Sequence, residues 1–116
     1  KVDNISHLAK LRTVKLGQWV NSVSCLTNLT SLDLGSNMFI NNDELQGLTQ
    51  LTHLDLGDNR FITNDALRKL TNLTHLDLSN NDAITDDAFN TLTKLTYLDL
   101  GYETISCNAN EKCEKY

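Results

Sequence analysis

The stretch Leu29-Thr30-Ser31-Leu32-Asp33-Leu34 decides the fold, because it recurs every 22 residues along the chain. Further copies begin at Leu51, Leu73 and Leu95, and each reads leucine-x-x-Leu-Asp-Leu. A fixed period of this kind predicts stacked units, each of which buries its apolar side against its neighbours. Such stacks are chiefly binding surfaces, so the period says more about architecture than about function.

Within each unit, the spacing of apolar residues indicates a short strand followed by a short helix. Counted from the first leucine, positions 4 and 6 are apolar on either side of a polar position 5, which is the alternation of a strand. Asn41, Thr63 and Thr85 then stand where a helix N-cap is expected, with carboxylates just after them. Apolar residues three apart follow, as on one stripe of a helix; they are Leu45 and Leu48, Leu67 and Leu70, and Phe89 and Leu92.

This alternation predicts an α/β solenoid. Parallel strands need a crossover connection, which the helix of each unit supplies. Because helices are wider than the spacing between strands, we expect a curved horseshoe segment. It has about five parallel strands on the concave face and short helices on the convex face.

The whole chain, residues 1–116, is predicted to be a single repeat domain. Residues 1–10 match the back half of a preceding unit, and residues 11–28 form a unit four residues shorter than the others. The remaining divisions are full units at 29–50, 51–72 and 73–94, then a strand and polar tail at 95–116. Both ends look incompletely capped, so self-association through them is expected if the chain serves as an assembly spacer.

The composition argues against several classes of function. The formal net charge of −5 disfavours nucleic acid, which requires clustered Lys and Arg. No apolar run is long enough for a membrane span, and no signal-peptide pattern opens the chain. No hydrolase, metalloprotease, P-loop or dinucleotide motif is present, so we expect neither an enzyme nor a cofactor.

Three cysteines do not suggest a disulfide framework. Cys25 lies beside a core leucine and is interpreted as a reduced thiol, whereas Cys107 and Cys113 can pair in the tail. Free thiols favour an intracellular, cytoplasmic location, although the sequence does not otherwise define the compartment.

These units resemble those of leucine-rich repeat proteins over nearly the whole chain. Phe61-Ile62-Thr63-Asn64-Asp65-Ala66-Leu67 and Ala83-Ile84-Thr85-Asp86-Asp87-Ala88-Phe89 are similar to a segment of the cysteine-containing, F-box-associated class. That class has Cys at position 9, where this chain has Asn37, Asn59 and Asn81. The resemblance implies partner binding on the concave sheet and, for this class, the substrate-recognition part of a ubiquitin-ligase-type adaptor, although no F-box segment is present. From the residues themselves, the asparagines are expected to satisfy the backbone of a buried turn.

Position 5 is expected to carry a row of charges on the concave wall: Lys15, Asp33, Asp55, Asp77 and Asp99. Adjacent strands lie about 4.8 Å apart, so the carboxylates repel one another. Three interpretations stay open. The row is a tolerated repeat residue, a docking strip for Lys or Arg of a partner, or a cation site whose ligands converge poorly because they lie in a line.

Position 3 faces the same side and places His53, His75 and Tyr97 beside the acidic row. We expect the pKa values of both histidines to rise, because a protonated imidazole between carboxylates is favoured. Position 8 adds Asp58 and Tyr102 at the edge of this wall, and tyrosine beside carboxylates is typical of a protein interface.

The predicted function is therefore a protein-interaction module that binds a basic protein surface through the concave face. No catalytic or metal-binding residues are assigned. The residues expected to bind the partner are Lys15, Asp33, His53, Asp55, Asp58, His75, Asp77, Tyr97, Asp99 and Tyr102.

Overall fold

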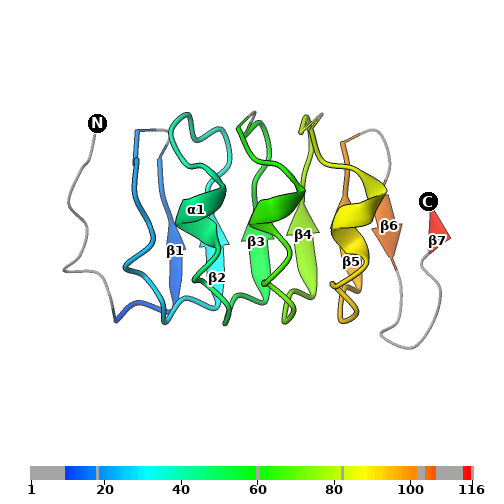
Figure 1. Ribbon diagram of the computed structural model, residues 1–116, viewed down its shortest axis with the longest axis horizontal. Helices are drawn as coiled ribbons and strands as arrows, with labels where there is room; N and C mark the ends of the chain where they lie inside the picture. The colour runs from blue at the N-terminus through cyan, green and yellow to red at the C-terminus, as the bar shows by residue number, and fades with distance from the viewer. Residues whose placement is uncertain are drawn as a thin grey trace.

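A computed structural model describes residues 10–17, 19–59, 61–81 and 83–101, together with the backbone of residues 104–106 and 114–115. Its strands form one sheet in sequence order, and the first five run parallel (Figure 1). The strands are β1 (Thr13–Lys15), β2 (Ser31–Asp33), β3 (His53–Asp55), β4 (His75–Asp77), β5 (Tyr97–Asp99), β6 (Thr104–Ser106) and β7 (Glu114–Lys115). The predicted solenoid of five parallel strands is confirmed.

Three short helical turns cover one face of the sheet, as predicted (Figure 1). They are α1 (Asn42–Leu45), which is α-helical, and η2 (Asn64–Ala66) and η3 (Asp86–Phe89), which are 3₁₀ turns. None of the helices in the described part of the chain has the length and apolar character to cross a membrane.

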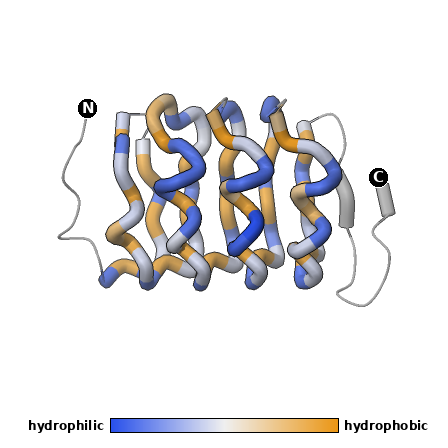
Figure 2. The backbone as a smooth tube through the Cα atoms, viewed as in Figure 1, coloured by the Kyte–Doolittle hydropathy of each residue, from blue (hydrophilic) through white to orange (hydrophobic). Residues whose placement is uncertain are grey.

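The repeated leucines form one continuous core. In Figure 2 their positions appear as hydrophobic, orange segments that recur from unit to unit along the tube. Burying a leucine side chain contributes about 1.5–3 kcal/mol, so the stack of leucines is the main source of stability. Leu11, the first leucine of the short unit 11–28, is an exception: it is 38% exposed, so the expected burial of each unit's apolar side is incomplete there. Among the described residues, its unit packs against a full unit on one side only.

The position-9 asparagines hold consecutive units together from inside. Each is buried, and its Nδ2 donates to a carbonyl oxygen of the preceding unit. Asn37 Nδ2 lies 2.7 Å from the oxygen of Val20, Asn59 Nδ2 lies 2.8 Å from that of Leu34, and Asn81 Nδ2 lies 2.7 Å from that of Leu56. The structural interpretation of this row is confirmed.

All three residues predicted at helix N-caps occupy those positions, but only one makes a side-chain capping hydrogen bond. Asn41 Oδ1 accepts hydrogen bonds from the backbone N–H groups of Asp43 and Glu44. Thr63 and Thr85 occupy the N-cap positions of η2 and η3, but their side chains make no capping hydrogen bond. The three predicted N-cap positions are therefore confirmed, but the two threonine hydroxyls bind the preceding unit instead of capping their own turns.

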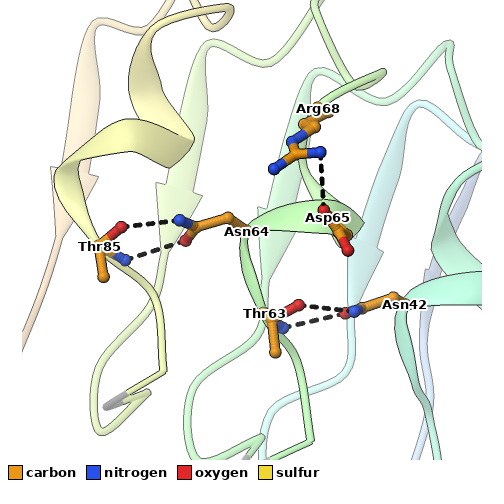
Figure 3. Close-up of polar contacts among 6 residues, drawn as sticks. All are labelled: Asn42, Thr63, Asn64, Asp65, Arg68 and Thr85. Atoms are coloured by element: carbon orange, nitrogen blue, oxygen red, sulfur yellow. Dashed lines mark hydrogen bonds and ion pairs between the residues drawn. The ribbon is translucent and has the colours of Figure 1, made fainter.

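An asparagine of one unit binds the N-cap threonine of the next at two points (Figure 3). Asn42 Nδ2 donates to Thr63 Oγ1 at 2.6 Å, and Asn42 Oδ1 accepts from the Thr63 backbone N–H at 2.9 Å. Asn64 repeats both contacts with Thr85, at 2.7 and 2.9 Å. The helical turns are therefore tied to one another by the same device in successive units.

The end of the chain departs from the prediction of a polar tail after the last parallel strand. β6 pairs antiparallel with β5, and β7 pairs antiparallel with β6. A strand along the backbone of β5 occupies hydrogen-bonding groups that would otherwise form an open sheet edge. The sheet is thus covered at this end by short strands that lie outside the 22-residue period.

Candidate binding site on the strand face

The parallel register places two columns of side chains on the side of the sheet opposite the leucine core. We call this surface the strand face. One column contains Asp33, Asp55, Asp77 and Asp99 at paired positions of β2 to β5, and the other contains Ser31, His53, His75 and Tyr97. Since neighbouring strands lie about 4.8 Å apart, each residue is close to its counterparts in adjacent units. The alignment predicted for positions 3 and 5 is confirmed.

Each aspartate of the column is held by the backbone of its own unit. Its Oδ1 accepts a hydrogen bond from the N–H two residues later, at 2.8–2.9 Å, and the donors are Gly35, Gly57, Ser79 and Gly101. Hydrogen bonds to an ionised carboxylate are stronger than neutral ones. These bonds offset part of the repulsion within the column and fix the direction of each carboxylate.

Asp55 lies in the middle of the column, and its environment disfavours its charge. Partial burial is the largest influence and raises the pKa of its carboxyl above 3.8. The hydrogen bond from Gly57 lowers the pKa, whereas the charges of Asp77 and Asp33 raise it again. The net result is an unfavourable charge held at the centre of the strand face.

The histidines of the second column stack on one another. The rings of His53 and His75 have centroids 4.2 Å apart and planes 11° apart, and the ring of Tyr97 continues the row 5.9 Å from His75. The pKa of His75 is lowered from 6.5, first by burial and then by the charge of His53. The expectation of a raised pKa is wrong for His75, because desolvation and the charge of the neighbouring His53 both lower it.

A shallow groove of about 210 Å³ runs along the strand face. Polar groups that line it include Asp33, Asp55 and Asp77, both stacked histidines, and Tyr97. At one end, Lys15 Nζ lies 3.6 Å from Asp33 Oδ2. This pair is largely exposed and contributes little to stability, so Lys15 is a weak partner for the acidic column.

Asp58 lies apart from this groove. Ser36, Asp58 and Asn80 occupy matching turns after the strands, with φ of 60°, 62° and 62°. Asp58 Oδ1 accepts from Asn80 Nδ2 at 2.8 Å, and its Oδ2 lies 3.5 Å from Ser36 Oγ. Asp58 helps to line a second hollow of about 560 Å³, with Asn37, Met38 and Phe61.

Other predicted features have mixed outcomes. Tyr102, Cys107 and Cys113 lie outside the described residues, whereas Cys25 is a free, exposed thiol. No group of three or more His, Cys, Asp or Glu side chains within the described ranges is arranged to hold a metal ion. Met38 and Phe61 were not predicted as site residues, although large apolar residues near the buried Ile40 and Ile62 in successive loops are a signal that the sequence contains.

Comparisons with known families agree with this architecture. A model of leucine-rich repeats in two copies matches residues 49–89, and a second leucine-rich repeat model matches residues 25–43. A search of curated proteins gave no significant match. With the fold described above, these matches place the chain among the leucine-rich repeat proteins.

Several solved structures share this fold. An internalin, inlF, from Listeria monocytogenes has 26% identity and a TM-score of 0.61 over 86% of this chain and 38% of its own. TLR13, solved in complex with ssRNA13, has 33% identity and a TM-score of 0.65 over 83% of this chain and 16% of its own. The Drosophila Toll–Spätzle complex has 21% identity and a TM-score of 0.66 over 85% and 15%. The present chain thus spans well under two thirds of the length of each of these three proteins.

Proposed function

We propose that this chain is a protein-interaction module whose strand face binds a basic surface of another protein. The observation that carries the proposal is the in-register column of four aspartates. Each is oriented by a backbone N–H through Oδ1, so Oδ2 can face a partner, although that of Asp33 already lies 3.6 Å from Lys15 Nζ. Like charges on adjacent strands reduce stability, and a cationic partner would relieve their repulsion.

The stacked rings add to this proposal. His53, His75 and Tyr97 supply flat, partly apolar surface beside the carboxylates, and such amphipathic rings are common in protein interfaces. The chain's negative charge disfavours a phosphate-bearing partner, in contrast to the RNA ligand of TLR13. A protein surface rich in Lys and Arg therefore suits this face best.

The test is capture of partners from cells by the wild type and two variants of equal charge. The double substitution Asp55→Asn and Asp77→Asn removes two charges but keeps an oxygen that can accept from Gly57 and Ser79. The double substitution Asp86→Asn and Asp87→Asn removes two exposed charges from η3, on the opposite side of the sheet. A partner that depends on salt, is lost with the first variant and is retained with the second supports the proposal. Equal binding of such a partner to all three proteins contradicts it.

An assembly element is the second candidate, and the exposure of Leu11 favours it. Together with the half-buried Val14 and Leu16, Leu11 presents an apolar end of the described stack. Terminal repeats usually need polar covers, so such an end can receive another unit. Sedimentation that depends on protein concentration, and is abolished by Leu11→Gln, would favour this function over the first.

A further inference from the structure

The loops that follow the first three strands lie at the upper edge of the molecule in Figure 1, and exposed apolar side chains gather along them. The described part of the chain exposes six large apolar side chains, and four of them lie in these loops. We call these four the rim patch: Trp19, Met38, Phe39 and Phe61, which are 50%, 53%, 40% and 67% exposed. Contiguous exposed apolar surface of this kind marks interaction sites in soluble proteins.

The fold itself does not require the aromatic residues of this patch. In each loop the following isoleucine, Ile40 or Ile62, is buried and fills the core. The fourth unit has Ala83 at the position of Phe39 and Phe61, and Ala83 is also exposed. A small residue is therefore sufficient at this position, and the aromatic rings of the two earlier units call for another explanation.

The patch includes a hollow large enough to receive a side chain. Met38 and Phe61 line it together with Asn37 and Asp58, and its volume is about 560 Å³. This lies within the range of roughly 300–1,000 Å³ that is typical of ligand pockets. The ring of Trp19 extends the apolar surface toward the first unit, with its centroid 6.1 Å from that of Phe39.

The charge of the hollow indicates what it binds. Among the described residues that line it, the charged one is Asp58, and the whole chain has a net charge of −5. A second copy of this chain would bring like charge against like charge. A positively charged segment has the opposite charge, so its basic residue can pair with Asp58 while its apolar residue enters the hollow.

We propose that the rim patch is a docking site for a protein segment in which an aromatic or large aliphatic residue is flanked by Lys or Arg. The apolar residue lies between Met38 and Phe61, and the basic residue pairs with the carboxylate of Asp58. This site is separate from the groove on the strand face and does not depend on binding there.

The chain contains its own reporters for a test. Met38 is its only methionine and Trp19 its only tryptophan. A ¹³C-methyl methionine label therefore gives one signal at the hollow, and tryptophan fluorescence reports the far side of the patch. Three peptides serve as probes: acetyl-Lys-Phe-Lys-amide, acetyl-Lys-Gly-Lys-amide and acetyl-Glu-Phe-Glu-amide.

The first peptide should shift the Met38 methyl signal saturably and bind at least about tenfold more tightly than the other two. Phe61→Ala, which copies the residue of the fourth unit, should reduce this binding about tenfold or more. Asp58→Asn should weaken it severalfold, since Asn80 shows that asparagine adopts the same backbone conformation. Asp86→Asn, which removes the same charge elsewhere, should leave binding unchanged.

Equal responses to all three peptides, or no shift of the Met38 signal, would overturn the proposal. Self-association that Phe61→Ala abolishes would also overturn it, because a second copy would then be the occupant. The variant Asp55→Asn/Asp77→Asn tests the strand face separately. Loss of peptide binding in that variant would show that the two surfaces are not independent.

Discussion

His53 and His75 lie face to face on adjacent strands, with ring centroids 4.2 Å apart. Two protonated imidazoles in this arrangement repel each other, and burial further disfavours the charge on His75. The strand face therefore favours a neutral histidine at position 75, even though carboxylates stand nearby.

The first prediction concerns the titration of this residue. An NMR titration should give His75 a pKa below 6.5, and His53→Gln should raise that pKa only partly, because burial is the larger cause. A folded-state pKa below the unfolded one means that, at a given pH near these values, the folded protein binds fewer protons than the unfolded chain, so acid favours unfolding. The contribution of His75 to stability is thus fully present above about pH 6.5 and is lost as the pH falls through its folded-state pKa. Urea unfolding of His75→Gln should lack this decline, and a His75 pKa at or above 6.5 would contradict the argument.

A second prediction is that Asp55→Asn stabilises the protein. The substitution removes a partly buried charge between two like charges and keeps an oxygen that can accept from Gly57. We expect a gain of about 0.5–1 kcal/mol in the free energy of unfolding at pH 7, the scale of like-charge repulsion between strands. Asp99→Asn is the matched control, since Asp99 makes the same hydrogen bond to Gly101 but has one described carboxylate neighbour in the column. A larger gain from Asp99→Asn would be inconsistent with repulsion as the cause.

Acid changes the contribution of Asp55 to stability in the opposite direction from that of His75. The folded-state pKa of Asp55 is raised above 3.8, so the folded protein binds this proton more tightly than the unfolded chain does. As the pH falls toward that raised pKa, protonation of Asp55 stabilises the fold. The stability advantage of Asp55→Asn should accordingly shrink in acid, and chemical denaturation at several pH values measures this.

The third prediction concerns the buried asparagines. Asn59→Ala removes the donor that reaches the carbonyl oxygen of Leu34, and that carbonyl group loses a partner inside the stack. The cost should be about 1–3 kcal/mol in the free energy of unfolding. Asn80→Ala is not a suitable control, because Asn80 has a positive φ; Asn90→Ala, at an exposed position after η3, should change stability by less than about 0.5 kcal/mol. Similar losses for Asn59→Ala and Asn90→Ala would show that the buried bond contributes nothing specific.

A fourth prediction follows from Glu44, which joins α1 to the short first unit. Its Oε2 accepts hydrogen bonds from Ser22 Oγ and from the backbone N–H groups of Val23 and Ser24, at 2.9–3.0 Å. Glu44→Ala should lower stability by about 1.5–3 kcal/mol, because bonds to a charged group are stronger than neutral ones. Asp43→Ala, at the exposed neighbouring position, removes the same charge and should cost less. Thermal unfolding of the two variants decides whether the contacts or the charge matter.

The strands were predictable from the sequence because their positions repeat with the period of the leucines. The register of Asp55 with Asp77 follows from that period alone, since parallel strands of identical units align residue for residue. The donor role of Asn59 was also predictable, because carbonyl groups of a buried turn need donors and an amide supplies them, although Asn59 Oδ1 has no hydrogen-bond partner.

The features that were missed depend on neighbours that the period does not reveal. The pKa of His75 is set by burial and by the charge of His53, whereas the sequence shows only that carboxylates are near. The bond between Asn64 and Thr85 was readable in retrospect, because an asparagine follows the N-cap residues Asn41 and Thr63, and each of these asparagines binds the N-cap threonine 21 residues later. β6 and β7 lie outside the repeat and are too short for a pattern of alternation to emerge.

The bonds from Asn42 to Thr63 and from Asn64 to Thr85 each reach one unit further along the chain and no more. Disruption at one end therefore has no direct route to the far end and must pass through every intervening unit in turn. Such a stack should fray progressively from its termini, so that amide hydrogen exchange is slowest in the central copies and any truncation is felt most by the unit that it newly exposes.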